Sequence, residues 1–301
     1  MKGQIMYLPY RKRTPDTQYQ EALRFIMKCG DILETPQDVP ARTCFGVSPP
    51  LVYFLHNGAP IITERQMGWR APIGEMCAFI NGVQDFAVMK SEFGVPAPFW
   101  EPWVTEQKCA KVGAETGHLG DASYGPALAA FPMSDGRTFD QFAHVVNMLS
   151  DAKLRKRRTI YATAWIPFMN GWGGNQRAVV SPCHGFIHFR AIGNKLDLVS
   201  WHRSADMPLG FPNDMIAYTA LLLAVGHLTK LAPRRIIFQL SDAHIYENQV
   251  EAVRTLAYSE PRRLPTLTLV HDIQNLRELR REHFELTDYH PHARMNIPTS
   301  V

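Results

Sequence analysis

The sequence predicts an α+β fold in which a large mixed β-sheet packs against helices. Two runs of alternating apolar and polar residues, 184–190 and 195–202, are joined by Gly193-Asn194, a pair that favours a tight hairpin turn. A long apolar run at 213–229, with Asn213 or Asp214 in its first turn, predicts a buried helix. Because strand and helix patterns are mixed along the chain, we expect helices packed on a substantial sheet.

The other predicted elements follow from the same periodicities. Residues 40–64 alternate and carry turn residues, which predicts short strands, whereas the Gly, Pro and aromatic residues of 93–126 predict a long irregular insertion. The sequence contains no internal repeat and no linker, so residues 1–301 are expected to form a single domain. Helices are predicted at 17–30, 70–81, 138–150 (capped by Thr138 or Asp135) and 246–258, and extended segments at 158–165, 235–240 and 264–270.

The charge balance argues against one broad class of function. The chain has 32 Lys and Arg against 28 Asp and Glu, and a net charge of +4 is small for 301 residues. A general polyanion binder is therefore not expected. Two basic runs remain, 154–158 and 277–281, and in the second Arg and Glu alternate, which predicts the solvated face of a helix. Nucleic acid is not an expected partner.

Cysteine usage and apolar run lengths indicate the compartment. The five cysteines are odd in number and include no CxxC pair, so we expect neither a disulfide framework nor a bound metal. The N-terminus lacks an apolar signal segment, and the apolar run 215–229 is too short and too polar to span a bilayer. The expected setting is the reducing cytoplasm, or the host cytoplasm for a phage-encoded protein.

Individual residues suggest chemistry only weakly. Cys183 sits between Pro182 and His184, where a turn can expose the thiol and a nearby cation can lower its pKa. The run 154–159 (LRKRRT) is either a solvated loop or an anion site. His244 and Tyr246 are two residues apart, so on a strand they would share a face.

An ordered series of motifs carries more information than any single residue. PCHGF, HRSADMPLGFPND, SDAHIYENQ, EPRRLPTLTL and FELTDYHPHARMNIPTSV follow one another over residues 181–301. This series resembles the thymidylate synthase family, and ARTCFG, IGEMCAFING, FWEPW, LGDASYG and GRTFDQF extend the resemblance upstream. The resemblance implies a thymidylate synthase-like fold. It also implies transfer of a one-carbon unit from 5,10-methylenetetrahydrofolate, as co-substrate, to carbon 5 of a pyrimidine nucleotide.

The resemblance gives several residues expected roles. Cys183 matches the nucleophile that adds at carbon 6 of the pyrimidine and makes carbon 5 reactive. Arg203, Ser204 and Arg42 match phosphate contacts, and Arg203 would also favour the thiolate. Further expected positions are catalytic Glu75, Tyr124, His184 and Asp206, the sugar-binding pair His244 and Tyr246, and folate contacts at Trp100, Trp103, Asp206, Gly210 and the C-terminal Val301.

The family also completes its phosphate site with two arginines from a second subunit. Arg157 and Arg158 are the candidates for these two arginines. Counting back from Ala164-Trp165 instead aligns Arg158 and Thr159 with the two arginines of the family. Either register implies a homodimer.

One departure from the family pattern concerns the base. Thymidylate synthases read LGxPFN at the start of the long helix, where the Asn amide pairs with uracil. In this chain a gap-free alignment places Asn213 at the Phe position and Asp214 at the Asn position. A carboxyl group accepts from the amino group of cytosine and, when protonated, also satisfies its ring nitrogen. The pattern GFxND resembles dCMP hydroxymethylases, so a cytosine nucleotide is the expected substrate, with dCMP first and CMP second. A one-residue shift would instead leave Asn213 as a reader of uracil.

The product depends on what reaches the methylene group that forms on the ring. Water gives a hydroxymethyl group, and hydride from tetrahydrofolate gives a methyl group. The cytosine-type signature favours hydroxymethylation, whereas Trp100, His184 and Val301 resemble the methylating branch. Hydroxymethylation is the primary expectation and reductive methylation the alternative, followed by thymidylate synthesis from dUMP.

Overall fold

The computed structural model describes residues 5–171 and 175–300. Its central element is a seven-stranded mixed sheet in the order β1-β2-β9-β8-β7-β6, with β3 also paired to β9. Of these pairs β8·β9 is parallel and the others are antiparallel. The strands are β1 (Asp31–Leu33), β2 (Ala41–Phe45), β3 (Leu51–Phe54), β6 (Tyr161–Thr163), β7 (Phe186–Ile192), β8 (Lys195–Asp206) and β9 (Ala232–Tyr246).

The predicted hairpin is confirmed as β7 and β8. Gly193 turns the chain with a φ of 63°, a conformation that glycine adopts without steric cost. Ile192 then pairs with Lys195 across the turn. The chain returns from β8 to the parallel strand β9 through the longest helix, α8 (Gly210–Thr229), as a parallel crossover requires.

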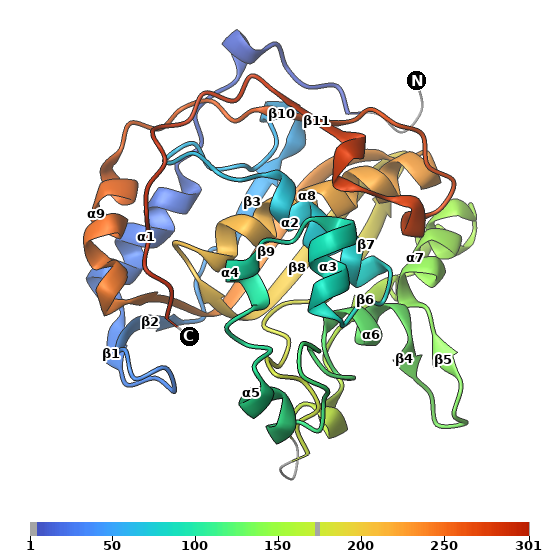
Figure 1. Ribbon diagram of the computed structural model, residues 1–301. Coiled ribbons are helices and arrows are strands. Elements are labelled where there is room, and N and C mark those ends of the chain that lie inside the picture. The colour runs from blue at the N-terminus through green and yellow to red at the C-terminus, as the bar shows by residue number, and fades with distance from the viewer. Residues whose placement is uncertain (1–4, 172–174, 301) are drawn as a thin grey trace.

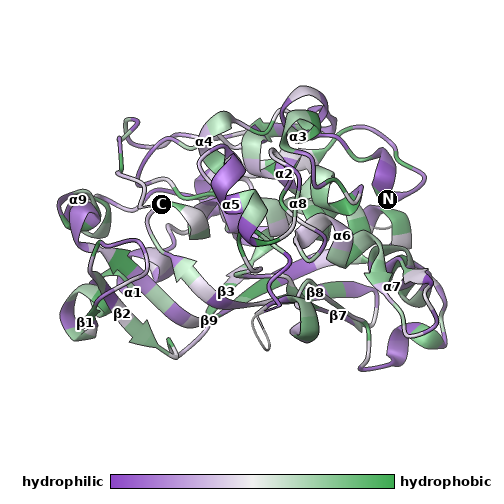
Figure 2. Ribbon diagram, turned by 60° about the horizontal axis from the view of Figure 1, so that its bottom comes forward, coloured by the Kyte–Doolittle hydropathy of each residue, from purple (hydrophilic) through white to green (hydrophobic). Residues whose placement is uncertain are grey.

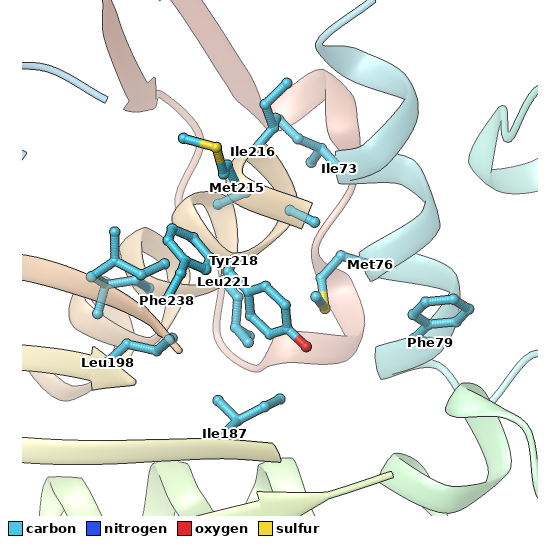
Figure 3. Close-up of a cluster of buried hydrophobic side chains, with 14 of the residues drawn as sticks. Ile73, Met76, Phe79, Ile187, Leu198, Met215, Ile216, Tyr218, Leu221 and Phe238 are labelled. Carbon is cyan, nitrogen blue, oxygen red and sulfur yellow. The ribbon is translucent and has the colours of Figure 1, made fainter. Parts of the chain in front are cut away.

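Helix α8 is buried almost all round because it lies between the sheet and a second layer of helices. It packs on β8 and β9 on one side and on α2 (Arg70–Ile80) on the other. Figure 3 shows this core, in which Tyr218 and Leu221 of α8 lie between Met76 of α2 and the sheet residues Leu198 and Phe238. Helices α2, α3, α6 and α8 lie on the same side of the sheet (Figure 2). The mixed α+β architecture and the single hydrophobic core agree with the sequence prediction.

Shorter helices surround this core (Figure 1). The segment 93–126 contains short helices joined by turns, and two small antiparallel sheets, β4·β5 and β10·β11, lie outside the main sheet. The elements are α1 (Gln18–Cys29), α3 (Phe86–Phe93), α4 (Ala97–Trp100), α5 (Glu106–Lys111), α6 (Tyr124–Ala129), α7 (Gln141–Ser150), α9 (Val250–Tyr258), β4 (Phe131–Pro132), β5 (Thr138–Phe139), β10 (Thr266–Leu269) and β11 (Phe284–Thr287).

Two sequence predictions were wrong in detail. The cap of α7 is Asp140, whose carboxylate accepts from the Ala143 N–H at 2.9 Å, because Thr138 is already part of β5. The basic run 277–281 is not a helical face. It connects two 3₁₀ turns, and its arginines bind the protein body, with Arg277 pairing with Asp140 and Arg281 donating to the Gly94 carbonyl.

Candidate active site

The two parallel strands end at the same edge of the sheet and bring their last polar residues together. Asp206 of β8 lies opposite His244 of β9 in the strand register, and Tyr246 ends β9 two residues later. Strand β2 flanks β9 on its other side and places Arg42 opposite Ile245. This edge therefore collects residues that are up to 204 positions apart, from Arg42 to Tyr246.

Cys183 lies in a tight turn at the start of the β7–β8 hairpin. Gly185 has a φ of 102°, and a Cβ atom there would come within 2.6 Å of the Ala164 Cβ, so only glycine fits. The backbone N–H of Cys183 donates to the Tyr124 hydroxyl at 2.7 Å. Its carbonyl accepts from the Arg203 backbone N–H at 2.8 Å. These contacts fix the direction of the thiol.

The guanidinium of Arg203 is the cation nearest to this thiol in the described contacts. It donates to the carbonyls of Ser181 at 2.6 Å and Pro182 at 2.8 Å, and its Nη2 lies 3.4 Å from the Cys183 Sγ. Burial raises the pKa of the Cys183 thiol, and the positive charge of Arg203 opposes that rise. The thiol is thus poised beside a fixed positive charge.

Asp214 lies in the first turns of α8 between two imidazoles. Its Oδ1 is 3.3 Å from His184 Nε2, and its Oδ2 is 3.4 Å from His202 Nδ1. Burial raises the pKa of Asp214 to about 6 and lowers those of His184 and His202 to about 4 and about 3. Both imidazoles are therefore neutral near pH 7. The neighbouring Asn213 instead donates to the carbonyl of Leu209 in its own helix at 3.1 Å.

Glu75 of α2 is a second buried carboxyl group, and its charge interacts with that of Asp214. It accepts a hydrogen bond from the indole N–H of Trp100 at 2.6 Å. Burial raises the pKa of Glu75 to about 8, so this side chain is a neutral acid at pH 7. Trp100 also packs edge-on against Tyr124, and the Tyr124 ring lies 4.5 Å from that of His184. These contacts link Glu75 to the Cys183 turn through aromatic rings.

The sheet edge carries a third buried carboxyl group, Asp206. Its oxygens accept from the Leu209 backbone N–H and from the Gln249 amide, both at 3.3 Å, and burial raises its pKa. The same Gln249 amide donates to the Pro298 carbonyl at 3.1 Å, so the C-terminal segment reaches this edge. His244 hydrogen-bonds Asp242 at 2.9 Å, and its ring lies 5.1 Å from that of Tyr246, as expected for residues that share a strand face.

Several expected site residues lie apart from the thiol or are engaged elsewhere. Arg42 forms an ion pair with Glu247 at 3.0 Å, and Arg157 and Arg158 are exposed after a 3₁₀ turn beside β7. The Trp103 ring holds the Lys108 ammonium at 4.3 Å. Ser204 is half-buried on β8, Gly210 begins α8, and the expected contact of Val301 lies outside the described residues.

Comparison with known families explains this arrangement. A family model described as thymidylate synthase matches residues 17–301. The chain belongs to the thymidylate synthase family. Membership implies folate-dependent one-carbon transfer to a pyrimidine nucleotide, with methylenetetrahydrofolate as the co-substrate. The sequence-based recognition of this superfamily is thereby confirmed.

Two further properties concern the described residues alone. In residues 5–171 and 175–300, no group of three or more His, Cys, Asp or Glu side chains is arranged to hold a metal ion. No helix in that part of the chain is long and apolar enough to cross a membrane.

Sequence reasoning missed some residues of this thymidylate synthase family site. His202 contacts the Asp214 carboxyl group and hydrogen-bonds Ser200. Tyr218 hydrogen-bonds His184, and Gln249 binds Asp206. His202 and Gln249 are the first and last residues of two recognised motifs, and Ser200 and Tyr218 are polar residues within apolar stretches. Strand alternation could have identified His202, because it follows the buried positions 198 and 200 on the covered face of β8.

Proposed function

We propose that this enzyme transfers a one-carbon unit to carbon 5 of a cytosine nucleotide, with dCMP as substrate, and releases the 5-hydroxymethyl product. The single observation that carries the proposal is the position of Asp214. Its carboxyl group lies beside His184, the residue next to the thiol, whereas the Asn213 amide is engaged by its own helix. A protonated Asp214 offers a donor for ring nitrogen 3 of cytosine and an acceptor for the exocyclic amino group. Uracil presents a donor and a carbonyl at those positions, so the match would be lost.

Cys183 is the proposed nucleophile. Attack of its sulfur on carbon 6 forms a carbon–sulfur bond and moves electron density to carbon 5 and towards ring nitrogen 3. Arg203, 3.4 Å from Sγ, favours the thiolate, and a proton from Asp214 neutralises the charge that develops at nitrogen 3. His184 and the Tyr124 hydroxyl hold the turn and the carboxyl group in place.

Glu75, Tyr124 and Asp206 supply proton handling and folate contacts in this proposal. Glu75 is neutral near pH 7, so it can donate to a water or to a departing amine. Asp206 can accept a ring N–H of the pterin, and the indoles of Trp100 and Trp103 with Gly210 provide apolar or close-packing surface for a flat ring. The bound folate supplies the one-carbon unit. Val301, outside the described residues, is proposed to close over it.

The phosphate and the sugar have separate proposed contacts. Arg203, Ser204 and Arg42 would bind the phosphate dianion, which would displace Glu247 from Arg42. His244 and Tyr246 would hold the 3′-hydroxyl of the sugar. Arg157 and Arg158 are proposed to complete the phosphate site of a second subunit, since both are exposed in the isolated chain. The active form would then be a homodimer.

Reductive methylation of dCMP is the second candidate, and one contact favours it. Trp100 is 7% exposed and is tied to Glu75 by its indole N–H, so it forms a rigid apolar wall. Such a wall would keep water from the methylene group and leave hydride transfer as the faster outcome. Thymidylate synthesis from dUMP is the third candidate, because a register in which Asn213 reads the base would permit it.

The test is the mass of the product formed from dCMP and methylenetetrahydrofolate, with dUMP and CMP in parallel. A gain of CH₂O together with tetrahydrofolate supports hydroxymethylation. A gain of CH₂ together with dihydrofolate would establish the methylase instead. Turnover of dUMP alone would overturn the cytosine assignment.

A further inference from the structure

His202 is a fully buried histidine with no role in the chemistry proposed so far. It lies on β8 with 0% exposure, among the rings of Phe211, Tyr218 and Phe238. A polar imidazole in such surroundings destabilises the fold unless its nitrogens are partnered. Burial lowers the pKa of His202 to about 3, so the ring is neutral at physiological pH and carries one proton on one nitrogen.

The two nitrogens of His202 have different surroundings. Nε2 is 3.1 Å from the Ser200 hydroxyl, whereas Nδ1 is buried and points at Asp214 Oδ2 from 3.4 Å. Within the described part of the chain, Nδ1 has no hydrogen-bond partner of good geometry. This pattern favours the tautomer in which Nε2–H donates to Ser200 and Nδ1 keeps its lone pair towards Asp214.

Counting protons around the carboxyl group shows what this tautomer requires of Asp214. The Tyr218 hydroxyl hydrogen-bonds His184 Nδ1 at 2.7 Å, and it donates there when that nitrogen is unprotonated. His184 then carries its proton on Nε2, which lies 3.3 Å from Asp214 Oδ1. With the Nε2–H of His202 directed at Ser200, the remaining contact, between Asp214 Oδ2 and His202 Nδ1, is a hydrogen bond only when Asp214 carries a proton. An ionised Asp214 would leave two lone pairs facing each other.

We propose that His202 is a positioning residue that biases Asp214 towards its protonated form and thereby strengthens the preference for the cytosine ring. The inference rests on the proposed function, since it assumes that Asp214 reads the base. A protonated Asp214 turns its O–H from His202 to ring nitrogen 3 when the nucleotide binds. The buried Nδ1 is thus the acceptor for this proton whenever Asp214 is protonated in the free enzyme.

The other groups that face Asp214 do not supply a competing positive charge. Glu75 from α2 is neutral near pH 7, and burial raises the pKa values of Tyr124 from α6, of Cys183 from the turn before β7 and of Tyr218 from α8 itself. His184 is neutral as well. The protonation of Asp214 is therefore controlled by burial and by its two imidazole neighbours.

The test combines NMR of the free enzyme with substrate discrimination. In ¹⁵N-histidine spectra of the wild type we expect His202 as the Nε2–H tautomer from pH 5 to 9. In ¹³C-aspartate spectra, assigned with Asp214→Asn, we expect His202→Gln to lower the titration midpoint of Asp214, because the glutamine amide can donate to the carboxylate. We expect the kcat/KM ratio of dCMP over dUMP to fall about tenfold in the same variant.

Two further variants keep the outcome interpretable. Ser200→Ala removes the acceptor of the His202 Nε2–H without touching Asp214, so it should also lower the titration midpoint of Asp214. This variant keeps the test possible if His202→Gln fails to fold. His227→Gln, at a surface pair with Asp272, is the matched control and should change neither quantity. An Nδ1–H tautomer, or an unchanged Asp214 midpoint in both site variants, would overturn the proposal. Absence of dCMP turnover in the wild type would contradict the proposed function alone, because the NMR titration still reports on His202.

Discussion

The thiol of Cys183 is subject to two opposing influences. Burial raises its pKa, and the Arg203 guanidinium at 3.4 Å opposes that rise. The same guanidinium also donates to two carbonyl groups of the turn, so it has both an electrostatic and a structural role. Separating the two roles requires variants that change charge and geometry independently.

Arg203→Gln is expected to slow alkylation of Cys183 by iodoacetamide about tenfold at pH 8, because the thiolate loses its positive neighbour. Arg203→Lys, which keeps the charge, should stay close to the wild type. Peptide mass spectrometry measures the rate, and the exposed thiol of Cys29 serves as the internal control. Equal slowing in both variants would mean that Arg203 acts on the turn and not on the charge.

Ionisation of the buried Glu75 carboxyl group is expected to lower the free energy of unfolding at alkaline pH. Its folded-state pKa of about 8 lies above the ordinary value of 4.5, so the folded state loses stability as pH rises from about 4.5 to about 8. Glu75→Gln removes this loss and can still accept from Trp100. We expect the free energy of unfolding of the variant to exceed that of the wild type by on the order of a few kcal/mol at pH 9. Below pH 4.5 the two should be equal. Urea unfolding across this pH range measures the difference, and a gain independent of pH would contradict the prediction.

Strands β8 and β9 and helix α8 together determine where the site lies. The sequence predicted the hairpin and α8 well, because their periodicity is strong and Gly193 marks the turn. The prediction ended the last central strand at residue 240, where the polar pair Ser241-Asp242 breaks the apolar pattern. The strand continues to Tyr246 because β2 and β8 pair with it on both sides. Helix α8 likewise begins at Gly210, since Pro212 is tolerated in a first turn.

The Gly185 turn is sensitive to a change as small as one methyl group. Gly185→Ala combines an unfavourable φ with a close approach to Ala164, so we expect a loss of roughly 2–3 kcal/mol in unfolding free energy and loss of turnover. Gly193→Ala is the matched control. It also has a positive φ but open space around its Cβ, so about 1 kcal/mol and normal turnover are expected. Equal effects of the two substitutions in urea unfolding would exclude the steric explanation.

At the scale of the whole molecule, contacts between distant segments of the chain form the candidate site. Local sequence patterns could not predict these contacts. Cys183 and Arg203 are 20 residues apart, and only the family resemblance linked them before the structure did. The pairing of Glu75 with Trp100 and of Gln249 with Asp206 also had no local signal in the sequence.

On the sheet, the side chains of Val199, Trp201 and Ile237 alternate with buried neighbours and are only half-buried in the isolated chain. A second subunit on this face would cover them.

Subunit complementation tests the proposed homodimer. Cys183→Ser and the double variant Arg157→Gln/Arg158→Gln should each lose most activity. A heterodimer isolated with two affinity tags contains one site with an intact thiol and intact arginines, so we expect roughly half of the wild-type activity. A heterodimer as inactive as both parents would contradict a shared phosphate site.

Base choice is tested most directly by the ratio of kcat/KM for dCMP over dUMP, measured in the wild type and in Asp214→Asn. The asparagine amide keeps the shape of the side chain but can donate to a carbonyl and accept from a ring N–H, as uracil requires. We expect the wild type to favour dCMP and Asp214→Asn to reverse that preference, by about 10²-fold or more in total. Asn213→Ala removes an amide that donates to the Leu209 carbonyl of its own helix, so it should leave the ratio unchanged. A wild type that prefers dUMP, or a ratio that follows Asn213 and not Asp214, would contradict the assignment of this enzyme to cytosine nucleotides.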